Sequence, residues 1–300
     1  MSKIKIRLNE KPFRPGGEVS GCIDLIFDRR VDVRDVLVRF SGSELTGVER
    51  RGGSGPRTGY KKAFPILDET KSLLKQIKSS GIGVSHPGGY IIVPASHTLY
   101  FTFPLPHDIT LSYIGRYVEV EYVVKATFDL PLARDLTDLE KVAISHPDVE
   151  LPQSNPIKLE GDPKKKKGHL DSDVSLEATM DRAYYKRGET MYGSLCIRSD
   201  ESMRHIRGIK LLLLGEEHFQ SPEGRTSSIK TREYSSRIDL SSIFRGYEKR
   251  SLEVPFSFEI PKDAQTTLEG KHFRHEWTFS LAVDVEDARD PVISHPVIIY

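Results

Sequence analysis

The stretch that decides the fold is residues 118–129, VEVEYVVKATFD, in which apolar and polar side chains alternate. Successive side chains of a β-strand point to opposite faces of its sheet, so this period of two predicts a half-buried strand. One face of the stretch is expected to be core and the other to face water. Similar alternation recurs at residues 4–8, 19–27, 36–40 and 273–283. The sequence therefore predicts an all-β protein.

Helical spacing of apolar residues is nearly absent from the chain. The one candidate is the segment 66–77, which follows Pro65 and contains Leu73 and Leu74. Proline is tolerated at the start of a helix and at the edge of a sheet, so the segment fits either a short helix or another strand. The sequence leaves both alternatives open.

The chain contains a duplicated unit. Its clearest trace is FTFPLP at residues 101–106, which returns as FSFEIP at residues 256–261. The positions that match at the same offset are Gly115, Val118, Glu121, Tyr122 and Val124 in the first copy and Gly270, Phe273, Glu276, Trp277 and Phe279 in the second. Earlier in each copy, residues 16–21 match 188–193 and residues 36–44 match 209–217. Such repetition, in a chain of many short strands, predicts two antiparallel β-sandwiches in tandem.

A polar segment rich in proline, glycine and lysine separates the two copies. It extends over residues 151–168 and includes the sequence GDPKKKKG. Segments of this composition are typical of domain boundaries, and 300 residues suffice for two sandwiches with separate cores. We therefore expect an N-terminal domain over residues 1–160, which includes the linker, and a C-terminal domain over residues 161–300.

Glycines recur at matching places in the two copies. Gly16 and Gly188 fall in predicted turns, where a positive φ angle or a close approach requires a residue without a Cβ atom. Gly21 and Gly193 fall within predicted strands, where a glycine marks either a β-bulge or tight packing against a neighbour.

No motif for catalysis or cofactor binding occurs in the sequence. It has no phosphate-binding G-x-x-x-x-G-K-[ST] loop, no G-x-S-x-G elbow, no H-E-x-x-H helix and no C-x-x-C pair. His272 and His275 are three residues apart, and an odd spacing on a strand puts them on opposite faces, which argues against joint metal ligation. We expect a non-enzymatic protein with no catalytic residue, no cofactor and no bound metal.

The tripeptide Ser-His-Pro occurs at residues 85–87, 145–147 and 294–296. We interpret these tripeptides as structural turns rather than as catalytic histidines, with corresponding strand ends of the two domains as an open alternative for the last two.

The charges of the chain are balanced, so any charge-driven binding must be local. The chain has 44 Lys and Arg against 43 Asp and Glu, a formal net charge of +1. The run Lys164, Lys165, Lys166 and Lys167 is a candidate for contact with anionic lipid or an acidic partner. It has only four lysines and has aspartates close by, which favours a solvated linker. The basic cluster of Arg50, Arg51, Arg57, Lys61 and Lys62 lacks the series of aromatic side chains that a nucleic-acid platform has, so we expect contact with lipid or protein and no nucleic-acid partner.

The expected compartment is the cytoplasm. The first residues contain no apolar stretch that would serve as a signal peptide, and no run of about 18 apolar residues suggests a membrane span. Cys22 and Cys196 fall on corresponding strands of separate domains, so we expect two free thiols rather than a disulfide.

These elements resemble the arrestin superfamily. FRPGGEVSG at residues 13–21 looks like the turn at its first strands, and FTFPLP at residues 101–106 looks like its Phe-x-Phe-x-Leu-Pro strand. The resemblance covers nearly the whole chain and implies two tandem arrestin-type, immunoglobulin-like β-sandwich domains. The segments SYIGRYV, YVVKA and LARDL, at residues 112–118, 122–126 and 132–136, are most similar to the arrestin-like subunits of the retromer and retriever endosomal sorting complexes.

The resemblance implies an adaptor that binds a large solenoid subunit. In the retromer subunit, a loop of the second domain carries an apolar pair ahead of a glycine and docks onto the solenoid. The matching residues here are Ile243, Phe244, Arg245 and Gly246. Such a partner would bury exposed apolar side chains on a loop, as Ile243 and Phe244 are expected to be. The same two side chains are equally suited to covering the edge of the sandwich.

Other partners implied by the resemblance are cargo peptides or sorting adaptors, bound near the junction of the domains by strand addition to an exposed sheet edge. Peripheral membrane contact is also implied, at endosomes if the source is eukaryotic. The sequence has no Pro-Pro-x-Tyr motif, so recruitment of ubiquitin ligases as in α-arrestins is not expected. The alternative is a free-standing structural or stress-related arrestin-like protein that self-associates through sheet edges. We expect function where the copies diverge, at residues 46–96 and 216–250.

Overall fold

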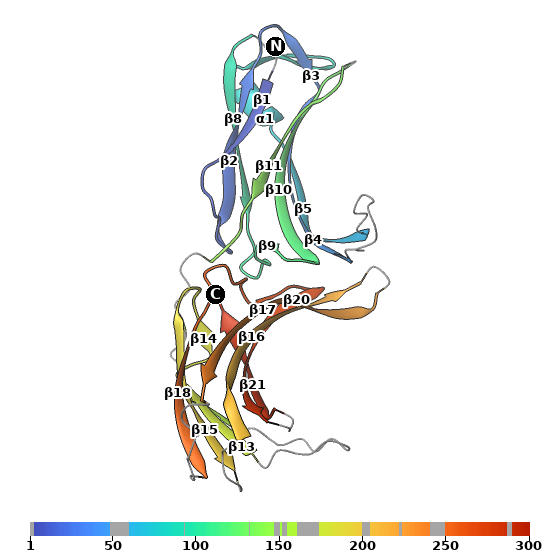
Figure 1. Cartoon of the computed structure of the whole chain (residues 1–300). Coiled ribbons are helices and arrows are strands. Elements are labelled where there is room, and N and C mark those ends of the chain that lie inside the picture. The colour runs from blue at the N-terminus through green and yellow to red at the C-terminus, as the bar shows by residue number, and fades with distance from the viewer. Residues whose placement is uncertain are drawn as a thin grey trace. The chain divides into compact units, whose positions relative to one another are not determined.

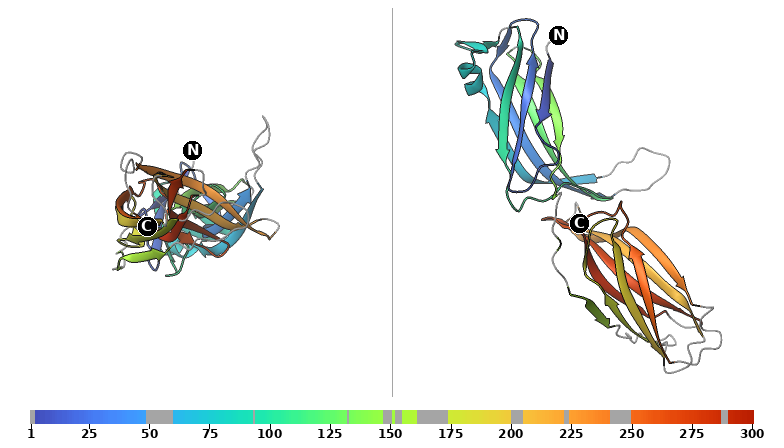
Figure 2. Two further views of the ribbon diagram at one scale, coloured as in Figure 1. Left: turned by 60° about the horizontal axis from the view of Figure 1, so that its bottom comes forward. Right: turned by 90° about the vertical axis from the view of Figure 1, so that its left-hand side faces the viewer.

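The computed structural model of the chain describes residues 3–48, 60–92, 94–131, 133–146, 151, 155–160, 174–199, 205–221, 224–240, 250–286 and 290–300. It divides into two compact units, residues 1–148 with 220–225 and residues 149–219 with 226–300. Each unit is a pair of facing β-sheets (Figure 1 and Figure 2). The prediction of an all-β protein with two tandem β-sandwiches is thus confirmed. The boundary at residue 160 stays a prediction, because residues 161–173 lie outside the described part.

The first unit packs a three-stranded sheet against a five-stranded sheet. The three-stranded sheet has the order β1 (Lys3–Leu8), β2 (Glu18–Ile26), β8 (Ser96–Pro104). The five-stranded sheet has the order β11 (Leu136–Val142), β10 (Val118–Asp129), β4 (Asp35–Val48), β5 (Tyr60–Ser72), and β9 (Tyr113–Ile114) pairs with β10. A small third sheet has the order β3 (Val31–Val33), β7 (Gly89–Ile92), β6 (Gly83–His86), and the helix α1 comprises Leu74–Ser79.

The second unit packs a four-stranded sheet against a six-stranded sheet. The four-stranded sheet has the order β12 (Ile157–Glu160), β13 (Val174–Met180), β15 (Thr190–Ser199), β18 (Ser251–Glu259). The six-stranded sheet has the order β14 (Tyr184–Tyr185), β21 (Val292–Ile299), β20 (Phe273–Val285), β16 (Ile206–Gln220), β17 (Thr226–Asp239), and β19 (Leu268–Glu269) pairs with β20.

The two units share one strand framework, which confirms the duplication. Strands β1, β2 and β8 take the places of β13, β15 and β18, and β11, β10, β4 and β5 take those of β21, β20, β16 and β17. The turns before the long strands also match: Gly115 N donates to Val118 O at 2.8 Å, and Gly270 N donates to Phe273 O at 2.9 Å. In the described chain, β3, α1, β6 and β7 belong to the first copy alone, and β12 to the second. The parallel pairing of β14 with β21 has its counterpart in the bridge between Phe13 and Ile144.

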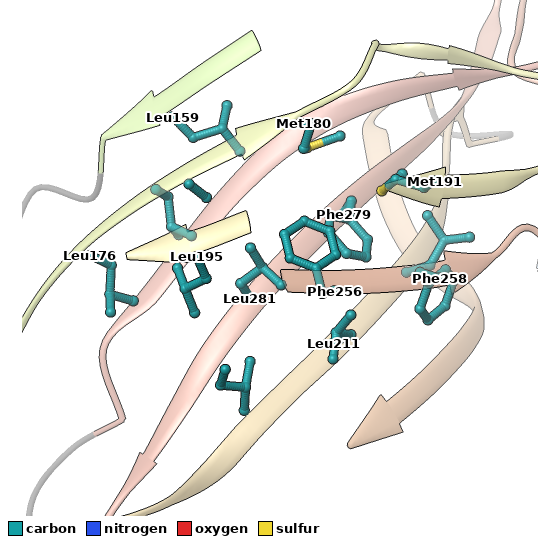
Figure 3. Close-up of a cluster of buried hydrophobic side chains, with 14 of the residues drawn as sticks. Leu159, Leu176, Met180, Met191, Leu195, Leu211, Phe256, Phe258, Phe279 and Leu281 are labelled. Carbon is teal, nitrogen blue, oxygen red and sulfur yellow. The ribbon is translucent and has the colours of Figure 1, made fainter. Parts of the chain in front are cut away.

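The alternating apolar side chains meet between the two sheets of each unit. On β10, the six alternating apolar side chains predicted to face the core are all buried: Val118, Val120, Tyr122, Val124, Ala126 and Phe128. In the second unit, Phe256 and Phe258 of β18 pack on Phe279 of β20, with ring centroids 5.8 and 5.4 Å apart (Figure 3). Fully burying a side chain of this size contributes about 1.5–3 kcal/mol, so such contacts hold the two sheets together.

The segment 66–77 is first strand and then helix, so each open alternative is correct for one part of it. Strand β5 continues to Ser72, and α1 begins at Leu74. Pro65 pairs with Ser43 at a register shift between β4 and β5, a β-bulge where a residue without an N–H is tolerated. The six residues of α1 form the only helix in the described ranges, and no described helix is long and apolar enough to cross a membrane.

The matched glycines have the backbone roles that the sequence predicts. Gly16 and Gly188 adopt φ angles of +75° and +81° in their turns. A Cβ atom on Gly21 or Gly193 would lie 2.3 Å from a carbonyl oxygen of the neighbouring strand β1 or β13. Strand pairing continues through both residues without a register shift, so these two glycines mark a close approach of strands and not a bulge.

Candidate functional site

The residues predicted for partner binding lie outside the part of the chain that the structure describes. The apolar loop at residues 243–246 falls within 241–249, and the lysine run at residues 164–167 falls within 161–173. The contacts predicted for them, with a solenoid subunit and with lipid or an acidic partner, stay predictions.

The two histidines near the start of β20 differ in their surroundings. His275 is fully buried, whereas His272 precedes the strand and is half-buried. His275 Nδ1 lies 3.1 Å from Thr266 O. Burial lowers the pKa of His275, although the contact with Thr266 and the charge of Glu217 act in the opposite direction. Across the described ranges, no group of three or more His, Cys, Asp or Glu side chains is placed to hold a metal ion.

Two smaller predictions have different outcomes. Cys22 and Cys196 are free thiols, as expected. Residues 85–87 lead from β6 into a turn, but residues 294–296 lie inside β21 and pair with β20, so the turn interpretation is wrong there. The main-chain groups of Pro296 point away from β20, where its missing N–H removes no bond from the ladder.

Each unit has one buried glutamate, and the two glutamates occupy matching positions in the two strand frameworks. Glu44 of β4 and Glu217 of β16 are 1% and 0% exposed. Beside Glu44, the buried hydroxyl of Tyr122 donates to Thr110 O at 2.6 Å, and burial together with the Glu44 charge raises the pKa of Tyr122. Both glutamates continue the core-facing alternation of residues 36–44 and 209–217, a signal that the sequence analysis missed. Both side chains are buried, so neither offers an exposed surface to a partner.

The edges of the narrower sheets are among the places where another chain has access to unpaired main-chain groups. An edge strand presents a row of N–H and C=O groups that a protein either covers or leaves open to a further strand. These edge strands are β1 and β8 in the first unit and β12 and β18 in the second.

In the first unit, two side chains close the outer edge of β8. Gln76 Oε1 accepts from Tyr100 N at 2.9 Å, and Gln76 Nε2 donates to Tyr100 O at 2.6 Å. This pair of bonds reproduces what a neighbouring strand would make. Lys71 Nζ donates to Thr102 O at 2.5 Å, two residues farther along the edge.

Gln76 is held in place by the excursion between β5 and β8. It belongs to α1, which is anchored by Leu73 and Ile77, 5% and 0% exposed. The second unit has no counterpart of α1 among its described residues.

One main-chain N–H of the edge strand β1 is capped by a side chain, and the counterpart of β1 in the second unit is paired with a further strand. Asp138 of β11 accepts from Ile6 N of β1 at 2.7 Å through Oδ2. Strand β13, which takes the place of β1, is paired along four residues with β12.

Among the described residues, no strand pairs with the outer edge of β18. Because Ser199 N donates to Arg250 O and Ile260 N donates to Glu189 O, the even-numbered residues of β18 bond to β15 and the odd-numbered ones point outward. The outward-pointing residues are Ser251, Glu253, Pro255, Ser257 and Glu259, all exposed. Within the described chain, no hydrogen bond reaches their outward main-chain groups. The matched edges of β8 and β18 thus differ, one closed and one open.

Gln76→Ala should lower the free energy of unfolding by about 1 kcal/mol, because two exposed hydrogen bonds to the main chain of Tyr100 are lost. Urea unfolding followed by circular dichroism measures the change. Lys75→Ala is the matched control, since Lys75 is an exposed neighbour on α1. A loss no larger than that of the control would show that the cap of β8 contributes little.

Two protein-family models match the chain, one in each half. The model described as the N-terminal domain of arrestin (or S-antigen) matches residues 3–147, and the model of the C-terminal domain matches residues 171–300. No curated protein matches the sequence. Together the two models span nearly all of the chain, and each coincides with one of the two related sandwiches. The chain therefore belongs to the arrestin family.

Proposed function

We propose that this protein is a non-enzymatic adaptor that binds other proteins through its sheet edges and loops. Arrestin-family proteins are generally non-enzymatic adaptors, and both arrestin domains match here. The observation that carries the proposal is the contrast between the matched edges: side chains close β8, whereas β18 stays open. An open edge is a common place for a partner segment to bind.

The finer form of this proposal is a subunit of the retromer or retriever type. It rests on the resemblance of residues 112–118, 122–126 and 132–136 to the arrestin-like subunits of those complexes. In this form the second domain binds a solenoid subunit through Ile243 and Phe244, and other surfaces bind cargo peptides or sorting adaptors. The protein then acts in the cytoplasm, with peripheral membrane contact, at endosomes in a eukaryote.

An affinity purification from the source organism tests this function. The wild-type chain should retain a helical-repeat protein, and Ile243→Asp/Phe244→Asp should weaken its binding about 30-fold, because an apolar anchor of an interface contributes about 2 kcal/mol or more. Binding is then measured between purified components. Val292→Asp is the matched control, since Val292 is an apolar residue of the same domain that is 52% exposed.

Two outcomes would contradict the proposal in different ways. Equal recovery by the double variant and the wild type would remove residues 243–246 as the contact. A stable homo-oligomer in light scattering, with no helical-repeat protein retained, would favour the self-associating structural protein instead.

A further inference from the structure

We propose that β18 is the docking strand for an extended segment of a partner protein in which two basic residues flank an apolar one. The segment adds to the four-stranded sheet as an antiparallel fifth strand beside β18. This inference rests on the proposed adaptor function and gives the chemistry of one class of partner.

The main chain of β18 supplies the ladder for such a strand. Its odd-numbered residues point their N–H and C=O groups away from β15. Pro255 has no N–H, so one hydrogen-bond donor is missing from the middle of this row. Any strand that pairs with β18 therefore forms one main-chain hydrogen bond fewer there. Side-chain complementarity then has more weight in deciding which segment binds.

Two glutamates give this edge its charge. Glu253 and Glu259 are both exposed, and their even separation puts them on the same, water-facing side of the sheet. Neither takes part in an ion pair or a side-chain hydrogen bond in the described chain. Opposite charges directly across a strand pair contribute about 0.2–1 kcal/mol each, so basic residues opposite these two positions favour binding.

Strand β17, at one edge of the six-stranded sheet, is different in this respect. Its basic side chains already have acidic partners. The pairs are Lys230 with Glu233, Arg232 with Asp263, and Arg237 with Asp284. Because the basic side chains of β17 are already in ion pairs, they have less charge to offer a partner segment, and β17 is the less suitable docking edge.

An exposed aromatic residue adds an apolar contact beside β18. Tyr192 of β15 is 59% exposed and is the cross-strand partner of Ser257. Because the serine side chain is small, the tyrosine ring stays accessible from the β18 side. An apolar residue of the incoming strand opposite Ser257 is therefore within reach of the ring.

These three positions define the spacing of the bound segment. Read along an antiparallel strand, a basic residue lies opposite Glu259, an apolar residue follows two positions later opposite Ser257, and a second basic residue follows after four more positions opposite Glu253. The segment therefore has the pattern [KR]-x-Φ-x-x-x-[KR], where Φ is apolar.

A second copy of this chain fits the edge poorly. Antiparallel pairing of two β18 strands about residue 256 places Glu253 opposite Glu259 in both directions, and like charges directly opposite are destabilising. Pairing about Pro255 places two prolines opposite each other, and neither has an N–H to donate. The same residues that suit a basic segment thus disfavour self-association through β18 in these two registers.

The experiment measures binding of a fluorescein-labelled peptide to the full-length purified chain by fluorescence anisotropy. The probe peptide carries lysine, leucine and lysine in the predicted spacing, and its counterpart carries glutamate in place of both lysines. The lysine peptide should bind about tenfold tighter than the glutamate peptide.

Two variants locate the binding on β18. Glu253→Lys/Glu259→Lys should reverse the preference so that the glutamate peptide binds more tightly. Ser257→Pro removes an outward N–H and should weaken both peptides, as Pro255 shows that the strand accepts proline at an outward position. The matched control is Glu18→Lys/Glu69→Lys, which makes the same change of net charge at exposed residues of the first unit.

The outcomes separate this inference from the adaptor function. Equal binding of the two peptides, an unchanged preference in the charge-reversal variant, or no binding at all would overturn the docking strand. A homodimer in light scattering that Ser257→Pro converts to monomer would also overturn it, because a second copy would then occupy the edge. The affinity purification of a helical-repeat partner does not depend on β18. It therefore tests the adaptor function separately from the docking strand. Urea unfolding of each variant checks that it remains folded, and the charge-reversal result does not depend on Ser257→Pro.

Discussion

Trp277→Ala should lower the free energy of unfolding of the second unit by about 3–5 kcal/mol, the range for removing a large buried aromatic side chain. Trp277 is 1% exposed, and its Nε1 donates to Gln265 O at 2.8 Å. The ring lies 5.9 Å from Tyr234 and, edge to face, 5.2 Å from His275 between centroids. A Cβ atom on Gly215 would lie 2.9 Å from the ring, so the indole rests directly on β16. Alanine leaves a cavity and an unsatisfied carbonyl.

The measurement is urea unfolding followed by far-ultraviolet circular dichroism, since the variant loses the only tryptophan of the chain and its fluorescence. Tyr192→Ala serves as the control, because it removes an exposed aromatic residue of the same unit and should change the free energy by only about 0.5 kcal/mol. Trp277→Phe separates ring burial from the hydrogen bond to Gln265. A loss below about 1 kcal/mol for Trp277→Ala would contradict the close packing of Trp277 on Gly215.

The strand framework was predictable because it depends on local patterns that repeat. Alternation along residues 118–129 fixes which side chains of β10 face the core, and the offset between FTFPLP and FSFEIP fixes which strands correspond. The division of residues 66–77 into strand and helix was not predictable. It depends on burial of Leu73 and Ile77 against neighbours that no short sequence window contains.

The closed and open edges were harder to predict than the strands. Gln76 closes β8 by bonding to Tyr100, 24 residues away in the sequence, and nothing in the residues around Gln76 indicates that contact. The sequence carries part of the signal for the open edge of β18. Glu253, Pro255 and Glu259 alternate with core residues in this strand, which matches β8 of the first unit. The predicted loop at residues 243–246 came from family resemblance alone and stays a prediction.

Gly193→Ala should lower the free energy of unfolding by about 3 kcal/mol, an unusually large effect for the addition of one methyl group. The new Cβ atom would lie 2.3 Å from Thr179 O and 2.4 Å from the Phe256 ring, both closer than real Cβ atoms come to other groups. The ring has little room to move, because Phe256 is 6% exposed and stacks on Phe279. The strand pair β13 and β15 must therefore separate at this point, with loss of ladder hydrogen bonds.

The matching glycine of the first unit makes this prediction sharper. A Cβ atom on Gly21 would lie 2.3 Å from Arg7 O and 2.8 Å from the Phe101 ring, so Gly21→Ala should cost about the same, roughly 3 kcal/mol. Ser194→Ala, beside Gly193 on β15, adds no atom and controls for substitution in this strand; urea unfolding compares all three variants. A small loss for one glycine variant and a large loss for the other would mean that the close approach of strands is not a shared property of the duplicated framework. Similar losses for both would mean that glycine is kept at this position in each copy by the approach of a neighbouring carbonyl, since neither residue needs a positive φ angle.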